Sequence, residues 1–291
     1  MPELPEVEVT RRCIEPFLVG RVIEAVHTTP ASYFFLTPPG QLKKSLPGRK
    51  VGAVSRHGKY LRALLDNGQT LVLHLGMTGQ LFSSGATSVR LLSAAARAAL
   101  APGEQAAFKP DKHTHLRLCF ADGGPDVLFR DVRKFGKVLL LGVNGRDERL
   151  ERLGIDALEA SGIELFSATR KKRSPIKSLL LDQSVIAGIG NIYADEALFL
   201  AGVKPTRPCR RVKSAECHAI VAAAQRVMLR SIETGGSSIS DYVAPDGTDG
   251  GYQDERQVYA REGEACPKCG HKIVRVIVGQ RSSHYCPACQ K

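Results

Sequence analysis

The order of apolar and polar positions divides the chain into a strand-rich first half and a helical second half. Between residues 21 and 141, short apolar runs alternate with Gly, Pro, Asn and Asp, which is the pattern of strands joined by turns. Strands repeated at this spacing are typical of a β-sandwich or a β-barrel. The predicted strands cover residues 21–26, 60–65, 70–75, 115–120, 127–131 and 137–141.

Helices are predicted on both sides of this region. Over residues 3–19 the apolar residues recur at helical spacing, so one face of a helix is expected to be buried. The pattern becomes helical again near residue 142 and stays helical to about residue 233, which places a domain boundary near residues 145–155. Helix starts are predicted at Ser174, Asn191 and Ser214.

One segment, residues 83–112, fits neither half. Its centre is rich in Ala, which favours helix, and Pro and Gly follow, so a helix and a loop are predicted. We interpret this segment as a surface insertion within the strand region.

Composition and charge narrow the class of protein. The chain has 291 residues, 43% hydrophobic and 24% charged, which is ordinary for a globular chain of about two domains. Lys and Arg outnumber Asp and Glu by 41 to 29, and the net charge of +12 favours a polyanionic partner such as nucleic acid. The sequence has no apolar stretch of about 18 residues and no secretory leader, so a cytoplasmic location is expected.

Four of the eight cysteines form a metal-binding pattern. Two closely spaced pairs, Cys266-x2-Cys269 and Cys286-x2-Cys289, can present four thiolates to one tetrahedral zinc ion. Two disulfides are the alternative, which the lack of a leader disfavours. Four thiolates leave no open position for water, so the zinc is expected to be structural and to hold the β-hairpin predicted between the pairs. The other cysteines are expected to be buried.

The chain begins Met1-Pro2-Glu3-Leu4-Pro5-Glu6. Methionine is commonly removed before proline, and Pro2 would then present a secondary amine beside the Glu3 carboxylate. An α-amino group titrates near pH ~8 and is therefore partly nucleophilic at neutral pH. Its adduct with an aldehyde carbon would be a charged iminium, which favours elimination. The alternative is that this run only starts a helix, with proline in the first turn and acidic residues matched to the helix dipole.

Several motifs further along are individually weak. Residues 186–196 place Gly188, Gly190 and Asn191 before a helix, which suits a phosphate oxygen but also describes an ordinary capped helix start. The basic run at residues 170–173 fits either a solvated surface or a DNA-binding surface.

Candidate residues also lie at strand ends. Lys59 follows a glycine at a strand entrance, while His74 and Met77 lie in a glycine-flanked turn. Arg133 and Phe135 lie at a predicted hairpin tip. Taken singly, each of these residues is more often structural or simply solvated than functional.

The joint order of these motifs resembles the bacterial formamidopyrimidine-DNA glycosylase family over essentially the whole chain. Several separate motifs in this order are not expected by chance. They are Pro2-Glu3-Leu4-Pro5-Glu6-Val7-Glu8, His57-Gly58-Lys59-Tyr60, His74-Leu75-Gly76-Met77-Thr78-Gly79, Arg133-Lys134-Phe135-Gly136, Gly188-Ile189-Gly190-Asn191-Ile192-Tyr193 and Gln280-Arg281-x4-Cys286-x2-Cys289-Gln290.

The resemblance implies an α+β fold. It consists of an N-terminal helix and a two-sheet β-sandwich, then a helix-two-turns-helix domain with a C-terminal zinc-finger β-hairpin. The implied parts are a catalytic domain at residues 2–145 with an atypical insertion at about 83–112, a DNA-binding helical domain at 150–235, a lesion-capping loop at 236–256 and a zinc finger at 257–291.

The implied activity is that of a bifunctional base-excision-repair enzyme. It is a DNA glycosylase and AP lyase that removes oxidised purines, chiefly 8-oxoguanine and formamidopyrimidines, through a Pro2 Schiff base and then β,δ-elimination. The implied partner is damaged double-stranded DNA, the implied cofactor is one structural Zn²⁺, and the enzyme is expected to be a monomer that acts at the bacterial nucleoid. No membrane partner is expected.

The resemblance also assigns roles to residues. Pro2 would be the nucleophile, Glu3 the acid that protonates the deoxyribose ring oxygen, and Lys59 a catalytic phosphate contact, with Glu6 supporting the site. Four residues would bind DNA: His74, Arg133, Asn191 and Arg281. Three would fill the gap left by the everted nucleotide: Met77, Arg133 and Phe135. The zinc ligands would be Cys266, Cys269, Cys286 and Cys289.

Two departures and two alternatives accompany the resemblance. Val132 and Lys134 replace residues common in the family's hairpin, which bears on the rigidity of that loop, and Ser237-Ser238 replace threonines in the capping loop, which bears on base preference. The nearest alternative is an endonuclease VIII-like enzyme for oxidised pyrimidines, which Leu4 disfavours. The other is a non-catalytic zinc-dependent DNA-binding protein, which would not need the Pro2 and Glu3 pair.

Overall fold

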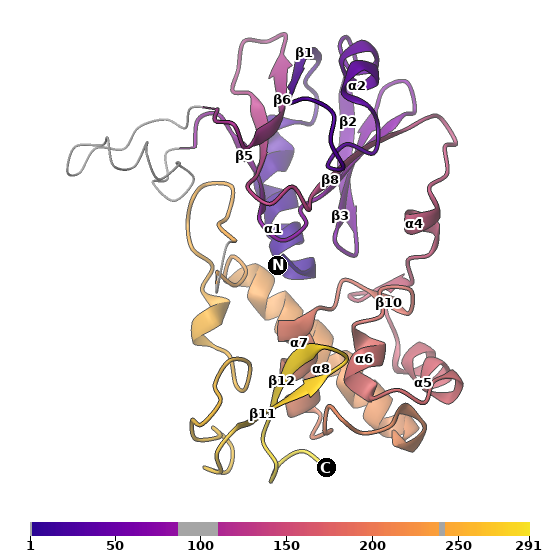
Figure 1. The fold of residues 1–291 in the computed structure, drawn as a ribbon, viewed down its shortest axis with the longest axis vertical. Coiled ribbons are helices and arrows are strands. Elements are labelled where there is room, and N and C mark those ends of the chain that lie inside the picture. The colour runs from indigo at the N-terminus through magenta and orange to yellow at the C-terminus, as the bar shows by residue number, and fades with distance from the viewer. Residues whose placement is uncertain (1, 87–109, 239–241) are drawn as a thin grey trace, which may run out of the picture. The chain divides into compact units, whose positions relative to one another are not determined.

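The computed structural model describes residues 2–86, 110–238 and 242–291 (Figure 1). Most of the predicted insertion, including its predicted helix, lies outside these residues. Within the part that is described, no helix is long and apolar enough to cross a membrane.

The chain divides into two compact units. The first contains residues 1–147 together with residues 234–251, and the second contains residues 148–233 together with residues 252–291.

The first unit contains two four-stranded antiparallel sheets and an N-terminal helix (Figure 1). One sheet has the order β1-β6-β7-β5, and the other has the order β2-β3-β4-β8. Helix α1 packs against β2, β3 and β5. The helices are α1 (Leu4–Ile14), the 3-10 turn η1 (Glu15–Phe17) and α2 (Pro39–Ser45). The strands are β1 (Ile23–Thr28), β2 (Val51–His57), β3 (Tyr60–Leu65), β4 (Thr70–His74), β5 (Gly79–Ser83), β6 (Thr114–Phe120), β7 (Val127–Asp131) and β8 (Lys137–Leu141).

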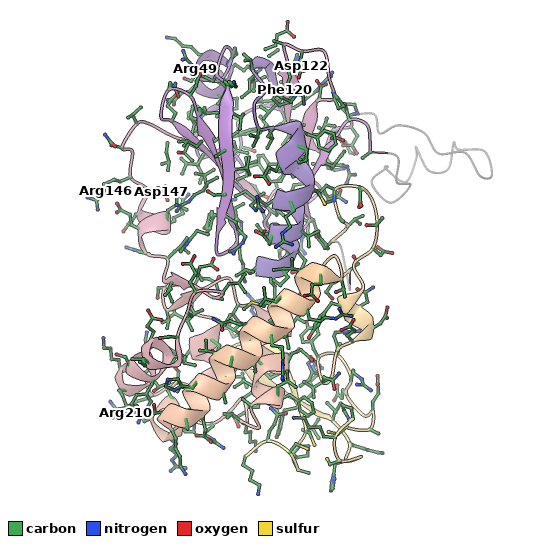
Figure 2. The ribbon with its side chains drawn as sticks, turned by 180° about the vertical axis from the view of Figure 1, so that it is seen from behind. Arg49, Phe120, Asp122, Arg146, Asp147 and Arg210 are labelled. Atoms are coloured by element: carbon green, nitrogen blue, oxygen red, sulfur yellow. The ribbon has the colours of Figure 1, made fainter. Side chains whose placement is uncertain are left out.

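Alternation along the strands builds the core of this unit. In β3 and β8 every second residue is buried, and one apolar cluster joins both sheets through residues such as Leu61, Leu73, Leu116 and Phe129. Figure 2 labels Phe120 and Asp122 near the end of β6. The Arg21 guanidinium stacks 3.9 Å from the Phe120 ring centroid and binds Asp122 at 2.7 Å.

The second unit is mainly helical and ends in a two-stranded hairpin. Its long helix α8 (Ser214–Glu233) packs against both α5 (Gly162–Lys171) and α7 (Asn191–Leu200). The other elements are α4 (Glu148–Glu151), β9 (Ile155–Asp156), α6 (Ile176–Leu180), β10 (Ile186–Ala187), η3 (Cys209–Arg211), η4 (Tyr252–Asp254), β11 (Val274–Val278) and β12 (Arg281–Tyr285). Strands β11 and β12 pair antiparallel between the two cysteine pairs.

The predicted strands and helix starts are confirmed to within a few residues, but two expectations are wrong. Residues 142–160 hold only the single turn of α4 and the short strand β9, because glycines interrupt the segment. At Gly154 a Cβ atom would lie 2.2 Å from the Val185 carbonyl oxygen, so the backbones approach too closely for a side chain. Cys13 and Cys119 are only partly buried, and Cys119 lies between two core residues of β6, so its side chain faces away from the core.

Candidate functional site

The start of α1 is a capped helix end in which two carboxylates are buried. The Glu3 side chain accepts the backbone N–H of Glu6, and Glu6 Oε2 accepts the backbone N–H of Glu3 at 2.8 Å. Glu3 is 3% exposed and Glu6 is 2% exposed. This reciprocal pair satisfies two N–H groups that a helix start otherwise leaves open. Pro2, which is also buried, therefore precedes a residue whose backbone and carboxylate are both held in place.

The other oxygen of Glu6 binds a residue of the segment 234–251, which we call the 234–251 loop. Glu6 Oε1 accepts the backbone N–H of Ser237 at 2.9 Å. Gly236 has a φ of +89°, and a Cβ atom there would lie 3.0 Å from the Tyr242 ring, so this close packing requires glycine. Burial, together with the Glu6 charge, raises the pKa of Tyr242 well above its ordinary value, which keeps the phenol neutral. Glu6 thus joins the helix start that carries Pro2 to Ser237, which lies within residues 236–256, the segment that the family resemblance predicts to be a lesion-capping loop.

An ion pair connects α1 to the turn that carries Lys59. Arg56 at the end of β2 places its Nε atom 3.3 Å from Glu8 Oε2, and its Nη1 donates to the carbonyl oxygen of Gly58 at 2.9 Å. Burial alone would raise the pKa of Glu8, but hydrogen bonds from Arg11 and Arg12 and the nearby Arg56 charge hold it below its ordinary value. The Glu8 carboxylate is therefore ionised at neutral pH, and it ties the Lys59 turn to the helix that begins beside Pro2.

Lys59 lies in the turn between β2 and β3, and His74 is the last residue of the neighbouring strand β4. Lys59 is 7% exposed and directly precedes Tyr60, whose ring lies 4.7 Å from the His74 ring between centroids. Tyr60 and His74 are cross-strand partners, and His74 is in turn the partner of Lys137 on β8. Three groups able to donate hydrogen bonds to a phosphate, Lys59, His74 and Lys137, therefore gather at one end of this sheet.

The hydrogen bonding of His74 determines its protonation. Its Nδ1 atom accepts the backbone N–H of Gly76 at 3.1 Å, so the proton of the neutral ring resides on Nε2. Burial, then the positive charges of Lys59 and Lys137, lower the pKa of His74 to about 4. At neutral pH His74 is therefore an uncharged donor, and the positive charge beside it comes from Lys59 and Lys137.

The three residues predicted to fill the gap left by the everted nucleotide, which we call the wedge, lie on two turns that touch each other; they are Met77, Arg133 and Phe135. A Cβ atom at Gly76 would lie 2.5 Å from the backbone N of Gly136, so the turn that carries Met77 packs directly on the turn that carries Arg133 and Phe135. Phe135 is 42% exposed, and the Arg133 guanidinium lies 4.9 Å from its ring centroid. An exposed aromatic ring paired with an arginine is suited to insertion between bases and to hydrogen bonding with a base edge.

Asp131 binds the two wedge turns together. Its carboxylate is fully buried and accepts the Thr78 hydroxyl, the Arg133 N–H at 3.1 Å and the Gly136 N–H at 2.7 Å. Between Arg133 and Gly136, Lys134 adopts a left-handed conformation with a φ of +60°. This conformation is unfavourable for a residue other than glycine unless its surroundings hold it. The hairpin tip is thus braced despite the residues that depart from the family pattern.

In the second unit, Asn191 is the first residue of α7 and follows a braced glycine turn. The Gln183 amide accepts the Gly188 N–H at 2.9 Å and donates to the Ile189 carbonyl at 2.8 Å. Gly188 has a φ of +112°, which only glycine adopts readily. Asn191 Nδ2 lies 3.5 Å from the Tyr259 hydroxyl, while its Oδ1 is buried and has no hydrogen-bond partner among the described residues. The turn offers N–H groups and an amide, as a phosphate requires.

A buried ion pair connects this helix to the zinc-finger hairpin. Lys177 Nζ lies 2.6 Å from Asp195 Oδ1, with both side chains 0% exposed, and it also donates to the Ser282 carbonyl at 2.7 Å. Asp195 Oδ2 accepts the His284 N–H at 2.8 Å. The pair therefore fixes β12, whose first residue is Arg281, relative to α7, whose first residue is Asn191.

A second carboxylate of α7 holds the chain that leads into the zinc finger. Glu196 accepts three backbone N–H groups, from Gln257 at 2.8 Å, Val258 at 3.0 Å and Tyr259 at 2.9 Å. Burial raises the pKa of Glu196, although these three hydrogen bonds oppose the shift. Both carboxylates of α7 thus serve to place the segment from Gln257 to Tyr285.

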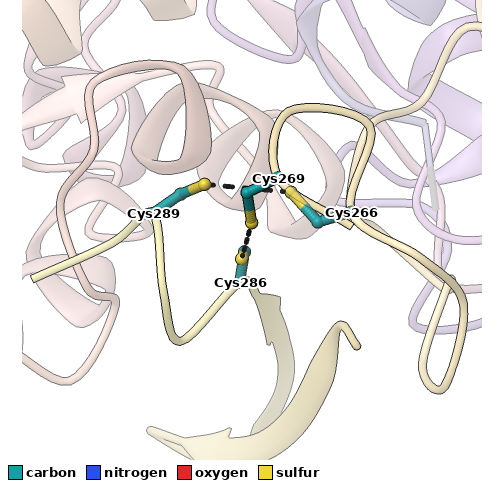
Figure 3. A group of neighbouring side chains, drawn as sticks. All are labelled: Cys266, Cys269, Cys286 and Cys289. Atoms are coloured by element: carbon teal, nitrogen blue, oxygen red, sulfur yellow. Dashed lines mark hydrogen bonds between the residues drawn. The ribbon is translucent and has the colours of Figure 1, made fainter. Parts of the chain in front are cut away.

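The four predicted zinc ligands converge on one point (Figure 3). The Sγ atoms of Cys266, Cys269, Cys286 and Cys289 all lie within 4.8 Å of one another, with Cys269 and Cys286 at 3.4 Å and Cys266 and Cys289 at 3.9 Å. A tetrahedron of Zn–S bonds of about 2.3 Å places its sulfurs about 3.8 Å apart, so the cluster fits one zinc ion. Zn²⁺ is the structural cofactor of this chain, and no ligand position remains for catalysis.

Several supporting residues were not identified from the sequence. Each of them has a partner that lies far away along the chain; they are Arg56, Asp131, Lys177 and Asp195. In the sequence each is only a charged residue within or at the end of a predicted element, and a solvated position gives the same pattern.

Comparison with known proteins identifies the family. Sequence models of the formamidopyrimidine-DNA glycosylase N-terminal domain, the H2TH domain of the same enzyme, and the zinc finger found in FPG and IleRS match residues 1–138, 153–243 and 263–291. The formamidopyrimidine-DNA glycosylases of Neisseria meningitidis and Thermus thermophilus are each 38% identical to this chain, and each match covers 100% of this chain. The match covers 100% of the length of the Neisseria protein and 98% of the length of the Thermus protein.

Solved structures give the same result. The crystal structure of the MutM (Fpg) protein of Thermus thermophilus has a TM-score of 0.82 at 35% identity and covers 99% of this chain and 98% of its own. A complex of Lactococcus lactis Fpg with DNA containing an abasic site has a TM-score of 0.83 at 32% identity and covers 99% of both chains. The chain therefore belongs to the formamidopyrimidine-DNA glycosylase family.

Proposed function

We propose that this protein excises oxidised purines from double-stranded DNA and then cleaves the strand at the resulting abasic site. Its full-length relatives are named formamidopyrimidine-DNA glycosylase, and solved relatives are described as complexes with Fapy-dG and with abasic-site DNA. The observation that carries the mechanism is the buried start of α1, where Glu3 directly follows Pro2 and is fixed by Glu6. A DNA-binding protein without catalysis would not need this arrangement.

The first chemical step replaces the base by the protein. After Met1 is removed, the Pro2 nitrogen attacks C1′ of the damaged nucleotide, and the bond from C1′ to the base breaks with its electron pair leaving on the base. The proton that the Pro2 nitrogen loses in this substitution balances the proton that the departing base takes up. Glu3 protonates the deoxyribose ring oxygen, which then leaves C1′ as a hydroxyl and opens the ring. The secondary amine yields an iminium that cannot lose its charge by deprotonation.

The second stage cuts the strand. The iminium withdraws electrons, so a proton leaves C2′ and the 3′ phosphate departs with the electrons of its C–O bond. A second elimination releases the 5′ phosphate, and water then hydrolyses the remaining adduct to free Pro2. No redox cofactor takes part, and the zinc has a structural role only.

DNA recognition is assigned to residues of both units. Lys59 and His74 would bind backbone phosphates from the first unit, and Asn191 and Arg281 from the second, which gives affinity that does not depend on sequence. Unstacking the damaged nucleotide costs a few kcal/mol, and insertion of Met77, Arg133 and Phe135 would offset part of that cost. Arg133 would contact the orphan base.

The setting of this reaction follows from its substrate. Because that substrate is chromosomal DNA, we propose that the protein acts at the bacterial nucleoid and as a monomer. The 38% identical relatives that share the full length of this chain are named formamidopyrimidine-DNA glycosylase, which favours this function over the endonuclease VIII-like alternative.

Borohydride trapping tests the proposed function. Processed protein is mixed with duplexes that carry 8-oxoguanine, thymine glycol or only intact bases, and covalent adducts are counted. We expect an adduct with the 8-oxoguanine duplex that depends on Pro2. The adduct should be lost in a variant that combines Pro2→Gly with added N-terminal residues, because residue 2 then has no free amine. Preference for thymine glycol would instead support the endonuclease VIII-like enzyme for oxidised pyrimidines. If neither lesion gave an adduct, the result would support a non-catalytic DNA-binding protein.

A further inference from the structure

Tyr33 makes a contact with the wedge that no sequence motif indicated. Its ring is 58% exposed, yet its hydroxyl donates to the backbone carbonyl of Arg133 at 2.9 Å, across 100 residues of sequence. The Lys137 ammonium lies 5.0 Å from the centroid of the same ring and donates to the Gly136 carbonyl at 3.0 Å. Tyr33 and Lys137 therefore contact carbonyl groups on both sides of Phe135.

The segment around Tyr33 is anchored firmly enough for this contact to restrain the wedge. Phe34 is fully buried, with ring centroids 4.9 Å from those of Phe129 and His115. The backbone of this segment pairs with β8: Val138 N–H donates to the Phe34 carbonyl at 3.0 Å, and Leu36 N–H donates to the Val138 carbonyl at 2.9 Å. The tyrosine thus extends from a fixed edge of the sheet.

Arg133 is consequently held at both of its backbone polar groups. Its N–H is fixed by Asp131 and its carbonyl by Tyr33. The next residue, Lys134, is in the left-handed region, so the peptide between them would turn more easily if one of the two restraints were removed. Rotation of that peptide would redirect the Arg133 side chain.

We propose that the Tyr33 hydroxyl is a positioning group for Arg133 and thereby sets how strongly the enzyme discriminates the base opposite the lesion. This inference rests on the proposed function, in which Arg133 contacts the orphan base. Tyr33 touches no reacting atom. It acts through the orientation of Arg133, because a hydrogen bond to a base edge requires a defined direction.

Tyr33→Phe removes the hydroxyl and keeps the ring. We expect the ratio of kcat/KM for 8-oxoguanine opposite cytosine to that opposite adenine to fall by about three- to tenfold, the range for one lost hydrogen bond. Trapping on a single-stranded abasic oligonucleotide, which has no opposite base, should be unchanged. Ser32→Ala is the matched control, since it removes a hydroxyl from the same segment; among the described residues that hydroxyl accepts a hydrogen bond from the nearby Phe34 N–H alone.

A double-mutant cycle separates positioning from general stability. If Tyr33 acts through Arg133, then Tyr33→Phe has no further effect on the discrimination ratio in an Arg133→Gln background. An equal effect in both backgrounds, or an unchanged ratio in the single variant, would overturn the proposal. If the wild-type protein excised no oxidised base, the proposed function itself would be contradicted, and this inference with it. If the wild-type protein excised the base but Tyr33→Phe left the discrimination ratio unchanged, the inference about Tyr33 alone would fail.

A second measurement does not depend on activity. The chain has no Trp, so Phe135→Trp places a single fluorophore in the wedge. We expect faster nanosecond depolarisation of this Trp in free protein when Tyr33→Phe is added, and no change when Ser32→Ala is added. Identical depolarisation with and without the Tyr33 hydroxyl would show that it does not restrain the wedge.

Discussion

The Glu6 carboxylate accepts the backbone N–H of Ser237 at 2.9 Å while its other oxygen accepts the backbone N–H of Glu3 at 2.8 Å. One buried side chain therefore holds the helix start that carries Pro2, the proposed nucleophile, and also holds the 234–251 loop. A carboxylate is required here because both partners are donors and a carboxylate only accepts.

Glu6→Gln should separate base excision from strand cleavage. The amide can accept only one of the two N–H groups and turns its own NH₂ toward the other, which leaves a buried donor unsatisfied at a cost of about 1–3 kcal/mol. We expect single-turnover excision of 8-oxoguanine to slow by about 10- to 100-fold, with a smaller loss on a preformed abasic site, where no base needs to be covered. Glu24→Gln, at an exposed position of β1, is the control. Equal losses of rate on the 8-oxoguanine duplex and on the abasic site would show that Glu6 acts by positioning the Pro2 amine rather than by holding the 234–251 loop.

The sequence predicts the family and the zinc cluster of this chain more fully than the arrangement of its strands. The cysteine spacing led directly to the zinc cluster, since metal geometry limits which spacings can work. The order of strands within the two sheets was not predicted, because an alternating pattern reveals which face of a strand is buried but not which strand lies beside it.

The supporting residues were hidden for a related reason. Pro2 and Glu3 are neighbours in sequence and could be interpreted together, whereas Asp131 acts on Thr78 and Tyr33 acts on Arg133 only because the strands bring them together. Such pairs leave no local periodicity. The domain limits and the roles assigned to individual site residues stay predictions that the experiments described here can test.

His74 should titrate far below an ordinary histidine. Its pKa of about 4 lies below the ordinary value of 6.5, so between these values the unfolded chain binds more protons than the folded one. The stabilising contribution is therefore complete above pH 6.5 and is lost as pH falls toward 4. NMR titration of the ring should give a midpoint near pH 4, and His74→Gln should flatten the fall of Tm between pH 7 and pH 5. A midpoint above pH 6 would contradict the neutral state assigned to His74.

Removal of zinc should weaken DNA binding without abolishing the fold of the first unit. The hairpin that carries Arg281 is a pair of strands, and two strands alone are marginally stable in water. Cys269→Ser or a strong chelator should therefore release one zinc ion per chain, measured by atomic absorption, and weaken binding to an abasic-site duplex. Cys13→Ser, which lies outside the cluster, should do neither.

The salt dependence of binding then identifies the lost contact. Arg281→Ala should reduce the slope of log Kd against log salt by about 0.9, the value for one phosphate contact. Zinc-free protein should show at least the same reduction. An unchanged slope in both proteins would show that the hairpin does not bind the DNA backbone.

Lys177→Met should destabilise the second unit through the charge it leaves behind. Asp195 would keep a buried carboxylate without its ammonium partner, and such losses typically cost about 3–5 kcal/mol. The double variant Lys177→Met with Asp195→Leu removes both charges and should recover part of this loss, as judged by urea unfolding monitored by circular dichroism. Lys172→Met breaks an ion pair with Asp182 in which Lys172 is 51% exposed, and it should cost less than about 1 kcal/mol. If the double variant were no more stable than Lys177→Met alone, the cost would come from lost hydrogen bonds to β12 rather than from the unpaired charge.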